Sequence, residues 1–251
     1  MSFSLRFLGV GSAQAVQLGS SGAVLERDGE PLLLIDCGPE TPTTYEKVYG
    51  TLPRAIYITH THMDHVGGLE RLFYSAYFDP AIKGTIKLYA HAALITHLQN
   101  RVADYPNVIA EGDANFWDAF VLVPCSRGFW HAGMWFDVFP TRHHAPMTSF
   151  GIALRGVFAW TGDTRPVPEM LAHFAPAPTV IAHDCALHGN PSHTGLEDLT
   201  REYPSDSRSR FMLYHYGSDA DGAALAASGH RVAQMGEVVA LPDYVAPELP
   251  E

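Results

Sequence analysis

The stretch that decides the fold is His60-Thr61-His62-Met63-Asp64-His65, where four side chains that can bind a metal stand close together. The run before it, Arg54–Thr59, predicts a buried strand, and Val66–Leu69, with its glycine pair, predicts a turn into a helix. Because side chains alternate along a strand, His60 and His62 project to the same side. Asp64 and His65 lie in the turn, within reach of a second ion. Imidazole and carboxylate together suit zinc or a similar divalent metal.

The charge balance limits the partners of the chain. It has 251 residues, 16 Lys and Arg against 27 Asp and Glu, and a formal net charge of −11. A protein that binds a long polyanion normally carries a basic stripe, because neutralising phosphates supplies most of the affinity. No such stripe is visible, so we expect no long nucleic acid as a partner. A small anionic substrate held by metals remains compatible with this charge.

The remaining composition is typical of a globular protein with ample material for a core, since 47% of the residues are hydrophobic. No window approaches the ~18 uninterrupted apolar residues of a membrane span, and the N-terminus has no signal-peptide layout. The three cysteines are few and widely spaced, which argues against a disulfide framework. We therefore expect a cytoplasmic protein without a membrane partner.

The pattern along the chain predicts an α/β fold in one domain, residues 1–241, followed by an acidic, proline-rich tail, residues 242–251. Strands are expected at Ser4–Leu8, Gly22–Arg27, Leu32–Asp36, Ala55–Thr59, Thr85–Ala90, Phe120–Val123, Trp135–Thr141, Phe150–Leu154, Val157–Thr161, Thr179–His183 and Arg210–Tyr214. Helices are expected at Leu69–Tyr77, His91–Asn100, Pro168–Phe174, Thr194–Tyr203 and Asp221–Ser228. A strand meander followed by alternating strands and helices suggests an αββα sandwich, two mixed sheets flanked by helices.

Ordered motifs beyond the histidine run carry a family resemblance. The chain resembles the metallo-β-lactamase superfamily, in particular its tRNase Z-like phosphodiesterase branch, and is most similar to the anti-Pycsar family of cyclic-nucleotide phosphodiesterases. The motifs that carry this resemblance are Phe7–Ala13, Leu34–Gly38, His60–His65, Phe150-Gly151, Trp160–Thr164, His183–Cys185, Ser192–Thr194 and Leu213–Tyr216.

The resemblance implies two divalent metal ions per subunit, with zinc as the first candidate and manganese as an alternative. One ion would take His60, His62 and a histidine near the end of the Trp135–Thr141 strand. The other would take Asp64, His65 and His215, and Asp163 would bridge both. Asp163 and His215 each follow a strongly apolar strand, where a polar side chain can enter a site.

The third histidine of the first ion is ambiguous, because His143 and His144 are adjacent and strand alternation points them to opposite faces. Only one of them should bind the metal. The spacing after Pro140 and before Ser149–Gly151 favours His143. His144 would then lie near the substrate or support a ligand.

The resemblance also implies a proton donor that contacts phosphate, which falls on His193, with Asp184 as the group that orients it. Thr194 is predicted to contact substrate beside His193. Asp64 is predicted to orient the nucleophile, a hydroxide shared by the two ions, as well as to bind metal. An alternative for this segment is structural, since Ser192 or Thr194 could cap the following helix with Glu197 completing a capping box.

The resemblance further implies hydrolysis of 3′,5′-cyclic nucleotides, including cyclic CMP and cyclic UMP, to nucleoside monophosphates, and a homodimer as the active form. Two enzymes of the same fold are rivals, a tRNA 3′-processing endonuclease and a lactonase-type hydrolase. The interval from His143 to Asp163 has no room for the long tRNA-gripping arm of the endonucleases, and His193 favours attack on phosphorus over carbon. A metal-binding protein without turnover is the third alternative. Base preference should come from the loops around Gln14–Ser21 and Asp104–Gly128.

Overall fold

Two seven-stranded sheets form the centre of the molecule in a computed structural model, which describes residues 1–104, 109–112 and 114–245. In spatial order, the first sheet contains β14 (Val238–Leu241), β1 (Phe3–Gly9), β2 (Gly22–Arg27), β3 (Glu30–Ile35), β4 (Ala55–Ile58), β5 (Ile86–His91) and β6 (Phe120–Cys125). The second contains β13 (Arg231–Val232), β12 (Phe211–Tyr214), β11 (Val180–Asp184), β10 (Phe158–Trp160), β9 (Phe150–Leu154), β8 (Met134–Pro140) and β7 (Gly128–His131).

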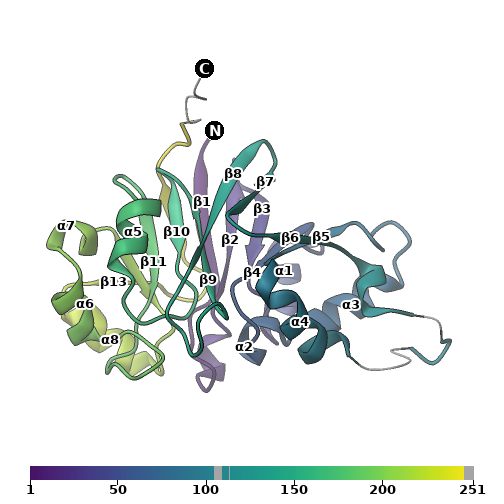
Figure 1. Cartoon of the computed structure of the whole chain (residues 1–251), viewed down its shortest axis with the longest axis horizontal. Coiled ribbons are helices and arrows are strands. Elements are labelled where there is room, and N and C mark those ends of the chain that lie inside the picture. Colours follow the sequence, from purple (N-terminus) through teal and green to yellow (C-terminus); the bar gives the residue numbers. More distant parts are fainter. Residues whose placement is uncertain (105–108, 113, 246–251) are drawn as a thin grey trace.

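Helices flank the two sheets on their outer sides (Figure 1). Those that follow strands of the first sheet are α1 (Thr41–Tyr49), α2 (Met63–Val66), α3 (Leu69–Tyr77) and α4 (Ile95–Leu98), with the short turns Val16–Leu18, Ala92–Leu94, Gln99–Ala103 and Phe116–Ala119. Those of the second are α5 (Pro168–Phe174), α6 (Leu196–Glu202), α7 (Ser205–Arg208) and α8 (Asp219–Ala227). The predicted αββα sandwich of two mixed sheets is confirmed, since both sheets combine parallel and antiparallel pairs.

The core between the sheets is built from inward-facing aromatic side chains. Phe7 of β1 lies 5.8 Å, centroid to centroid, from Trp160 of β10, and Tyr57 of β4 lies 5.8 Å from Phe129 of β7. Trp160, Tyr57 and Phe7 are fully buried. Each such side chain contributes about 1.5–3 kcal/mol by leaving water. A second core, between the first sheet and its helices, includes Phe73 of α3.

Two backbone hydrogen bonds connect the two sheets near the ends of their strands. The amide of Phe150 donates to the carbonyl of Thr59 at 2.9 Å, which joins the start of β9 to the end of β4. The amide of His215 donates to the carbonyl of Val10 at 2.7 Å, which joins the end of β12 to the end of β1. These contacts fix the loops of one sheet relative to those of the other.

The sequence missed some elements. Strands β7, β13 and β14 and helices α1 and α7 were not predicted, and Asp64 and His65, expected in a turn, lie in the short helix α2. The expected helix His91–Asn100 is instead a turn, a short α-helix and a π-helical turn. The segment Asp104–Gly128, whose loops were expected to set base preference, holds the turn Phe116–Ala119 and β6, while residues 105–108 and 113 lie outside the described residues. Residues 246–251 of the predicted tail also lie outside them.

In the described ranges, no helix combines the length and the apolar composition that crossing a membrane requires.

Candidate metal centre

The candidate ligands gather where strands of both sheets end. β10, β11 and β12 are mutually parallel, as are β4 and β5, so their carboxyl ends lie at one edge of each sheet. His60 follows β4, Asp163 follows β10, Asp184 is the last residue of β11 and His215 follows β12. Side chains far apart in the sequence therefore meet at one end of the sandwich, outside the carboxyl ends of parallel strands, where α/β proteins commonly bind ligands.

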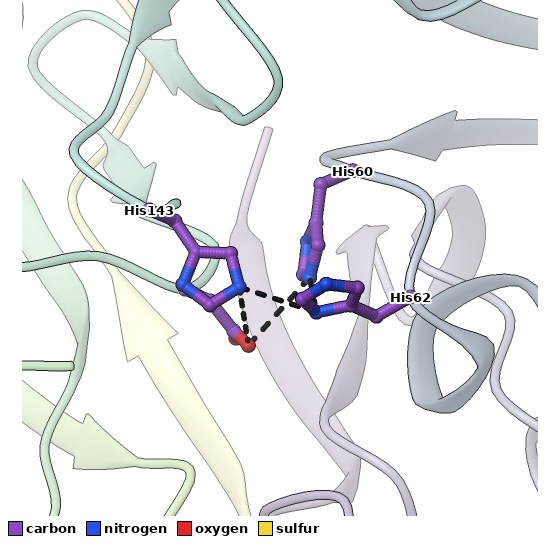
Figure 2. Close-up of side chains that lie close together, drawn as sticks. His60, His62 and His143 are labelled. Atoms are coloured by element: carbon purple, nitrogen blue, oxygen red, sulfur yellow. Dashed lines mark hydrogen bonds and ion pairs between the residues drawn. The ribbon is translucent and has the colours of Figure 1, made fainter. Parts of the chain in front are cut away.

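The first group of converging side chains is His60, His62, His143 and Asp163, whose ligand atoms all lie within 4.8 Å of one another. His62 Nδ1 is 3.1 Å from His60 Nε2 and 3.2 Å from His143 Nε2. Figure 2 shows the three imidazole rings pointing toward one another from two different parts of the chain. Asp163 Oδ2 lies 3.6 Å from His60 Nε2. Three imidazoles and a carboxylate converge on one point.

The second group is Asp64, His65, Asp163 and His215, again within 4.8 Å of one another. Asp163 Oδ1 lies 3.3 Å from His65 Nε2, and Asp163 Oδ2 lies 3.2 Å from His215 Nε2. Asp64 Oδ2 is 3.7 Å from His215 Nε2. Asp163 belongs to both groups, so its carboxylate occupies the shared position that the family resemblance assigned to it.

Unpartnered polar atoms in the second group fit a bound cation. His65 Nε2, His215 Nε2 and Asp163 Oδ1 are buried, and none of them has a hydrogen-bond partner among the residues that the structure describes. A buried polar atom without a partner costs about 1–3 kcal/mol, so such atoms usually have a ligand or water. The donors are imidazole nitrogen and carboxylate oxygen, the ligands that first-row divalent metals accept. The residues present therefore fit two divalent ions.

Hydrogen bonds hold the outer nitrogen of three rings. His60 Nδ1 lies 3.1 Å from Thr59 Oγ1, His143 Nδ1 donates to the carbonyl of Ser192 at 3.0 Å, and His65 Nδ1 lies 2.9 Å from a carboxylate oxygen of Asp36. With Nδ1 engaged in this way, Nε2 of each ring faces the group. Such support is what orients metal-binding histidines in proteins.

Asp36 contacts a candidate ligand, although the sequence analysis did not single it out. It directly follows β3, is fully buried, and has a left-handed backbone conformation (φ 60°). Its carboxylate also accepts the amide of Thr59 at 2.8 Å and the Thr59 hydroxyl at 2.9 Å. The available signal was an apolar strand that ends in an aspartate, the same pattern that marked Asp163.

Asp184 plays a comparable part on the second sheet. Its Oδ2 lies 2.8 Å from His193 Nδ1 and accepts the amide of Thr164 at 2.8 Å, while its Oδ1 lies 3.4 Å from His215 Nδ1. The predicted pairing of Asp184 with His193 is therefore present in the structure. Because Asp184 engages Nδ1 of His193, Nε2 of that ring is left to face the site.

The neighbouring His183 lies outside this arrangement. Its Nδ1 donates to the carbonyl of Asp184 at 2.7 Å and its Nε2 lies 2.7 Å from the hydroxyl of Tyr203, deep in the protein. The polar atoms of the His183 ring are fully used in packing α6 against β11, so this histidine is structural.

The electrostatics differ between the two groups. Burial lowers the pKa of His143 to about 4 and holds the pKa of His60 well below its usual value, so these rings favour the neutral form that binds metal. Burial also opposes protonation of His215, but the carboxylates of Asp163 and Asp184 raise its pKa to about 10. Asp163 and Asp36 likewise raise the pKa of His65 against the effect of burial. The second group thus favours positive charge, which a divalent ion supplies.

The structure distinguishes His143 from His144. His143 is buried and belongs to the first group, as the spacing favoured. His144 is exposed, has a left-handed backbone conformation (φ 49°), and places its ring 4.8 Å from that of His62 without joining either group. The two rings stay close, 4.1 Å from centroid to centroid, but the ring of His143 is buried among the ligand atoms whereas that of His144 lies on the exposed side.

Thr194 does not reach the surface predicted to contact substrate. It is fully buried, and its amide and hydroxyl both donate to the carbonyl of Thr164, at 2.9 and 2.8 Å. The capping alternative is also wrong in detail, because α6 begins after Gly195, whose amide donates to Asp198 Oδ2 at 2.9 Å. Thr194 therefore anchors the segment that carries His193.

A pocket of about 480 Å³ opens over the second group. Its lining includes the candidate ligands His62, Asp64, Asp163 and His215 together with His193. The rest of the wall comes from three segments that follow strands: Ser12, Ala13 and Gln14 after β1, Ala186, Leu187, His188 and Asn190 after β11, and, after β12, Gly217 together with Asp221 of the first turn of α8. The pocket is large enough for a nucleotide-sized molecule.

A ligand set of this kind at the end of an αββα sandwich defines a metal-dependent hydrolase of the metallo-β-lactamase fold. The structure is similar to that of the metallo-β-lactamase fold protein YhfI from Bacillus subtilis (TM-score 0.74, 15% identity, 96% of this chain and 100% of the other). It is also similar to the short form of human tRNase Z (TM-score 0.68, 18% identity, 96% and 100%). These likenesses confirm the fold.

The chain belongs to the anti-Pycsar protein Apyc1 family, whose model matches residues 3–239. The Apyc1 protein of Paenibacillus harenae is 29% identical over 226 residues, which cover 86% of this chain and 91% of that protein. The Apyc1 protein of Bacillus phage 010DV004 is 28% identical over 256 residues, covering 94% and 98%. Membership confirms the predicted resemblance and the predicted enzyme class, a metal-dependent phosphodiesterase.

Proposed function

We propose that the protein hydrolyses 3′,5′-cyclic nucleotides, with cyclic CMP and cyclic UMP among them, to nucleoside monophosphates at a centre of two divalent ions. The observation that carries this proposal is that the two ligand groups share Asp163 beside a pocket that also exposes His193. Two adjacent cation positions and a proton donor are an arrangement that can break a phosphodiester bond, because the ions stabilise the attacking and leaving oxygens and the donor protonates the leaving one. The Apyc1 family supports the choice of a cyclic nucleotide as substrate.

The residues of the chain divide the work as follows. His60, His62 and His143 would hold one ion, Asp64, His65 and His215 the other, and Asp163 both. When bound, such ions supply an activated water near neutral pH and positive charge for the phosphoryl oxygens. Asp64 is only partly buried and lines the pocket, so its carboxylate can also accept a hydrogen bond from the attacking water.

His193 supplies the proton that the leaving oxygen needs. Opening a cyclic phosphate breaks one bond between phosphorus and a ribose oxygen, and that oxygen leaves as an alkoxide unless a proton reaches it. Asp184 engages His193 Nδ1 and keeps the ring in one orientation, with its side chain 20% exposed at the pocket. Asp184 also raises the pKa of His193 against the effect of burial, so the ring can carry the proton.

The direct test is a substrate panel with metal-loaded protein. Cyclic CMP, UMP, AMP and GMP, a precursor tRNA and a lactone are incubated in parallel, and products are separated by chromatography. We expect nucleoside monophosphates from the cyclic nucleotides, loss of the activity with a chelator, and recovery with Zn²⁺ or Mn²⁺. Cleavage of the tRNA or the lactone without turnover of any cyclic nucleotide would contradict the proposal.

A matched pair of variants tests the ligand assignment. His143→Ala should remove most activity and lower the metal content, because this ring belongs to the first group. His144→Ala should keep the metal content and stay within about threefold of the wild-type rate, because its ring belongs to neither group. The opposite ranking would reassign the ligand.

We further propose that the protein acts as a homodimer in the cytoplasm, as the family resemblance and the sequence suggested. The exposed Trp130 on edge strand β7, which packs edge-on against Trp135, supports a protein contact there. Light scattering after size-exclusion chromatography measures the mass directly, and a monomer at all concentrations would contradict the dimer.

A further inference from the structure

Among the described residues that line the pocket, Asp221 has a charged side chain that the proposed chemistry does not use. With the phosphate at the two ligand groups, the nucleoside would contact the rest of this lining, which includes Gln14, Asn190 and Asp221. The side-chain amides of Gln14 and Asn190 can turn to donate or to accept, so they suit any base. The carboxylate of Asp221 can only accept at neutral pH. This position can therefore discriminate between substrates.

The conformation of Asp221 departs from the usual one at its place in a helix. Ser218-Asp219-Ala220-Asp221 has the spacing of a capping box, in which the serine hydroxyl and the acid each accept an amide of the other residue. The first hydrogen bond of this capping box is formed, since Ser218 Oγ accepts the amide of Asp221 at 3.1 Å. Among the described residues, the return bond from the Ser218 amide is absent.

Two other acidic residues in the first turns of helices accept the N-cap amide, the hydrogen bond that Asp221 does not make. Asp118 accepts the amide of Asn115 at 2.9 Å, and Asp198 accepts the amide of Gly195 at 2.9 Å. Asp221 instead directs its carboxylate over Gly217, where an added Cβ would come within 2.9 Å of Oδ2. Glycine at 217 leaves room for the carboxylate at the pocket wall. Within the described part of the chain it has no hydrogen-bond partner.

We propose that Asp221 accepts a hydrogen bond from a donor of the bound nucleoside, either an exocyclic amine of the base or the ribose 2′-hydroxyl, and thereby sets substrate preference. This inference rests on the proposed cyclic-nucleotide function. An amine contact favours cyclic CMP over cyclic UMP, because uracil presents the O4 acceptor where cytosine presents its amine. A 2′-hydroxyl contact favours every ribonucleotide over its 2′-deoxy analogue.

The test uses Asp221→Asn with Asp219→Asn as its matched control. Asp219 is in the same first turn of α8 and carries the same charge, but it is exposed and does not line the pocket. Steady-state kcat/KM is measured for cyclic CMP, cyclic UMP and 2′-deoxy cyclic CMP. Replacing the charged acceptor with a neutral amide weakens this hydrogen bond, because the charge that strengthens it is gone, and should lower kcat/KM of Asp221→Asn about tenfold, with the metal content unchanged.

The pattern of the loss identifies the donor. A fall for cyclic CMP that exceeds the fall for cyclic UMP assigns the base amine. An equal fall for both, with 2′-deoxy cyclic CMP slow in the wild type and insensitive to the variant, assigns the 2′-hydroxyl. Gly217→Ala, which keeps the charge but displaces Oδ2, should reproduce the same pattern.

The proposal is overturned if Asp221→Asn stays within about twofold of Asp219→Asn for all three substrates. That result would leave the proposed function intact, because the wild type would still turn over cyclic nucleotides. No turnover by the metal-loaded wild type would instead overturn the proposed function, and this inference with it.

Discussion

The two sheets contribute to the candidate metal centre in different ways. The first sheet delivers His60, His62, Asp64 and His65 from one continuous segment after β4. The second delivers its residues one strand end at a time, with His143 after β8, Asp163 after β10 and His215 after β12. The first contribution is a local property of the sequence, whereas the second exists only once the sheet has formed.

Each sheet also has one buried carboxylate that supports the site, and the two differ in what they support. Asp36 contacts one candidate ligand, His65, and the Thr59 backbone and hydroxyl; burial raises its pKa. Asp184 contacts both His215 and His193, which lower its pKa against the effect of burial. Asp36 therefore positions a ligand, while Asp184 links a ligand to the proton donor.

The largest effect is expected where the contributions of the two sheets meet. Asp163→Asn removes the one carboxylate shared by both ligand groups, so kcat for cyclic CMP should fall about 1000-fold or more and the metal content should drop. Mass spectrometry of the metals and steady-state kinetics measure both. If the variant keeps its metals and more than a tenth of the wild-type rate, the claim that Asp163 serves both ligand groups is contradicted.

The next largest effect is expected from His193, the proposed proton donor, which only the second sheet contributes. His193→Ala should lower the rate with cyclic nucleotides about 100-fold, because the leaving ribose oxygen then lacks its proton. With bis(p-nitrophenyl) phosphate the loss should be below about tenfold, since nitrophenolate leaves without protonation. Equal losses on both substrates would mean that His193 acts in another way.

The two supporting carboxylates can be compared directly. Asp36→Asn and Asp184→Asn should each weaken metal binding about 10-fold to 100-fold, as is typical of residues behind metal-binding histidines. Only Asp184→Asn should also show the substrate dependence of His193→Ala, because it alone contacts His193. If Asp36→Asn showed the same dependence, the proposed division between the sheets would be wrong.

The smallest effect on activity is expected far from the centre. Glu26 is buried on the first sheet, and although burial opposes its charged form, hydrogen bonds from Ser4, Arg6 and Tyr49 lower its pKa below 4.5. Glu26→Gln should lower the free energy of unfolding by about 2 kcal/mol at pH 7 with kcat unchanged.

The pH dependence gives the sign of this effect. A depressed folded pKa stabilises the protein above the unfolded pKa, and that contribution is lost as the pH falls through the folded value. The difference in unfolding free energy between wild type and Glu26→Gln should therefore shrink below about pH 4.5. The unfolding free energies are measured by urea denaturation at a series of pH values. A difference between wild type and variant that does not change with pH would contradict the role of the charge.

The sequence predicted the local part of the centre better than the distributed part. His60–His65 was readable because strand, turn and ligands are contiguous, and strand bounds such as Gly22–Arg27 were exact. β14 was missed because Val238–Leu241 becomes a strand only by pairing with β1 at the other end of the chain. Asp36 was missed because its partner His65 lies beyond a helix and a strand. The roles assigned to the site residues, the homodimer and the cytoplasmic location stay predictions.

The most direct test of the account is a titration of metal-free protein with Zn²⁺ while the turnover of cyclic CMP is followed. The account predicts that the rate rises until two equivalents per chain are bound and then stays constant, because both groups around Asp163 must be filled. Full activity at one equivalent, or turnover that does not depend on added metal, would contradict it.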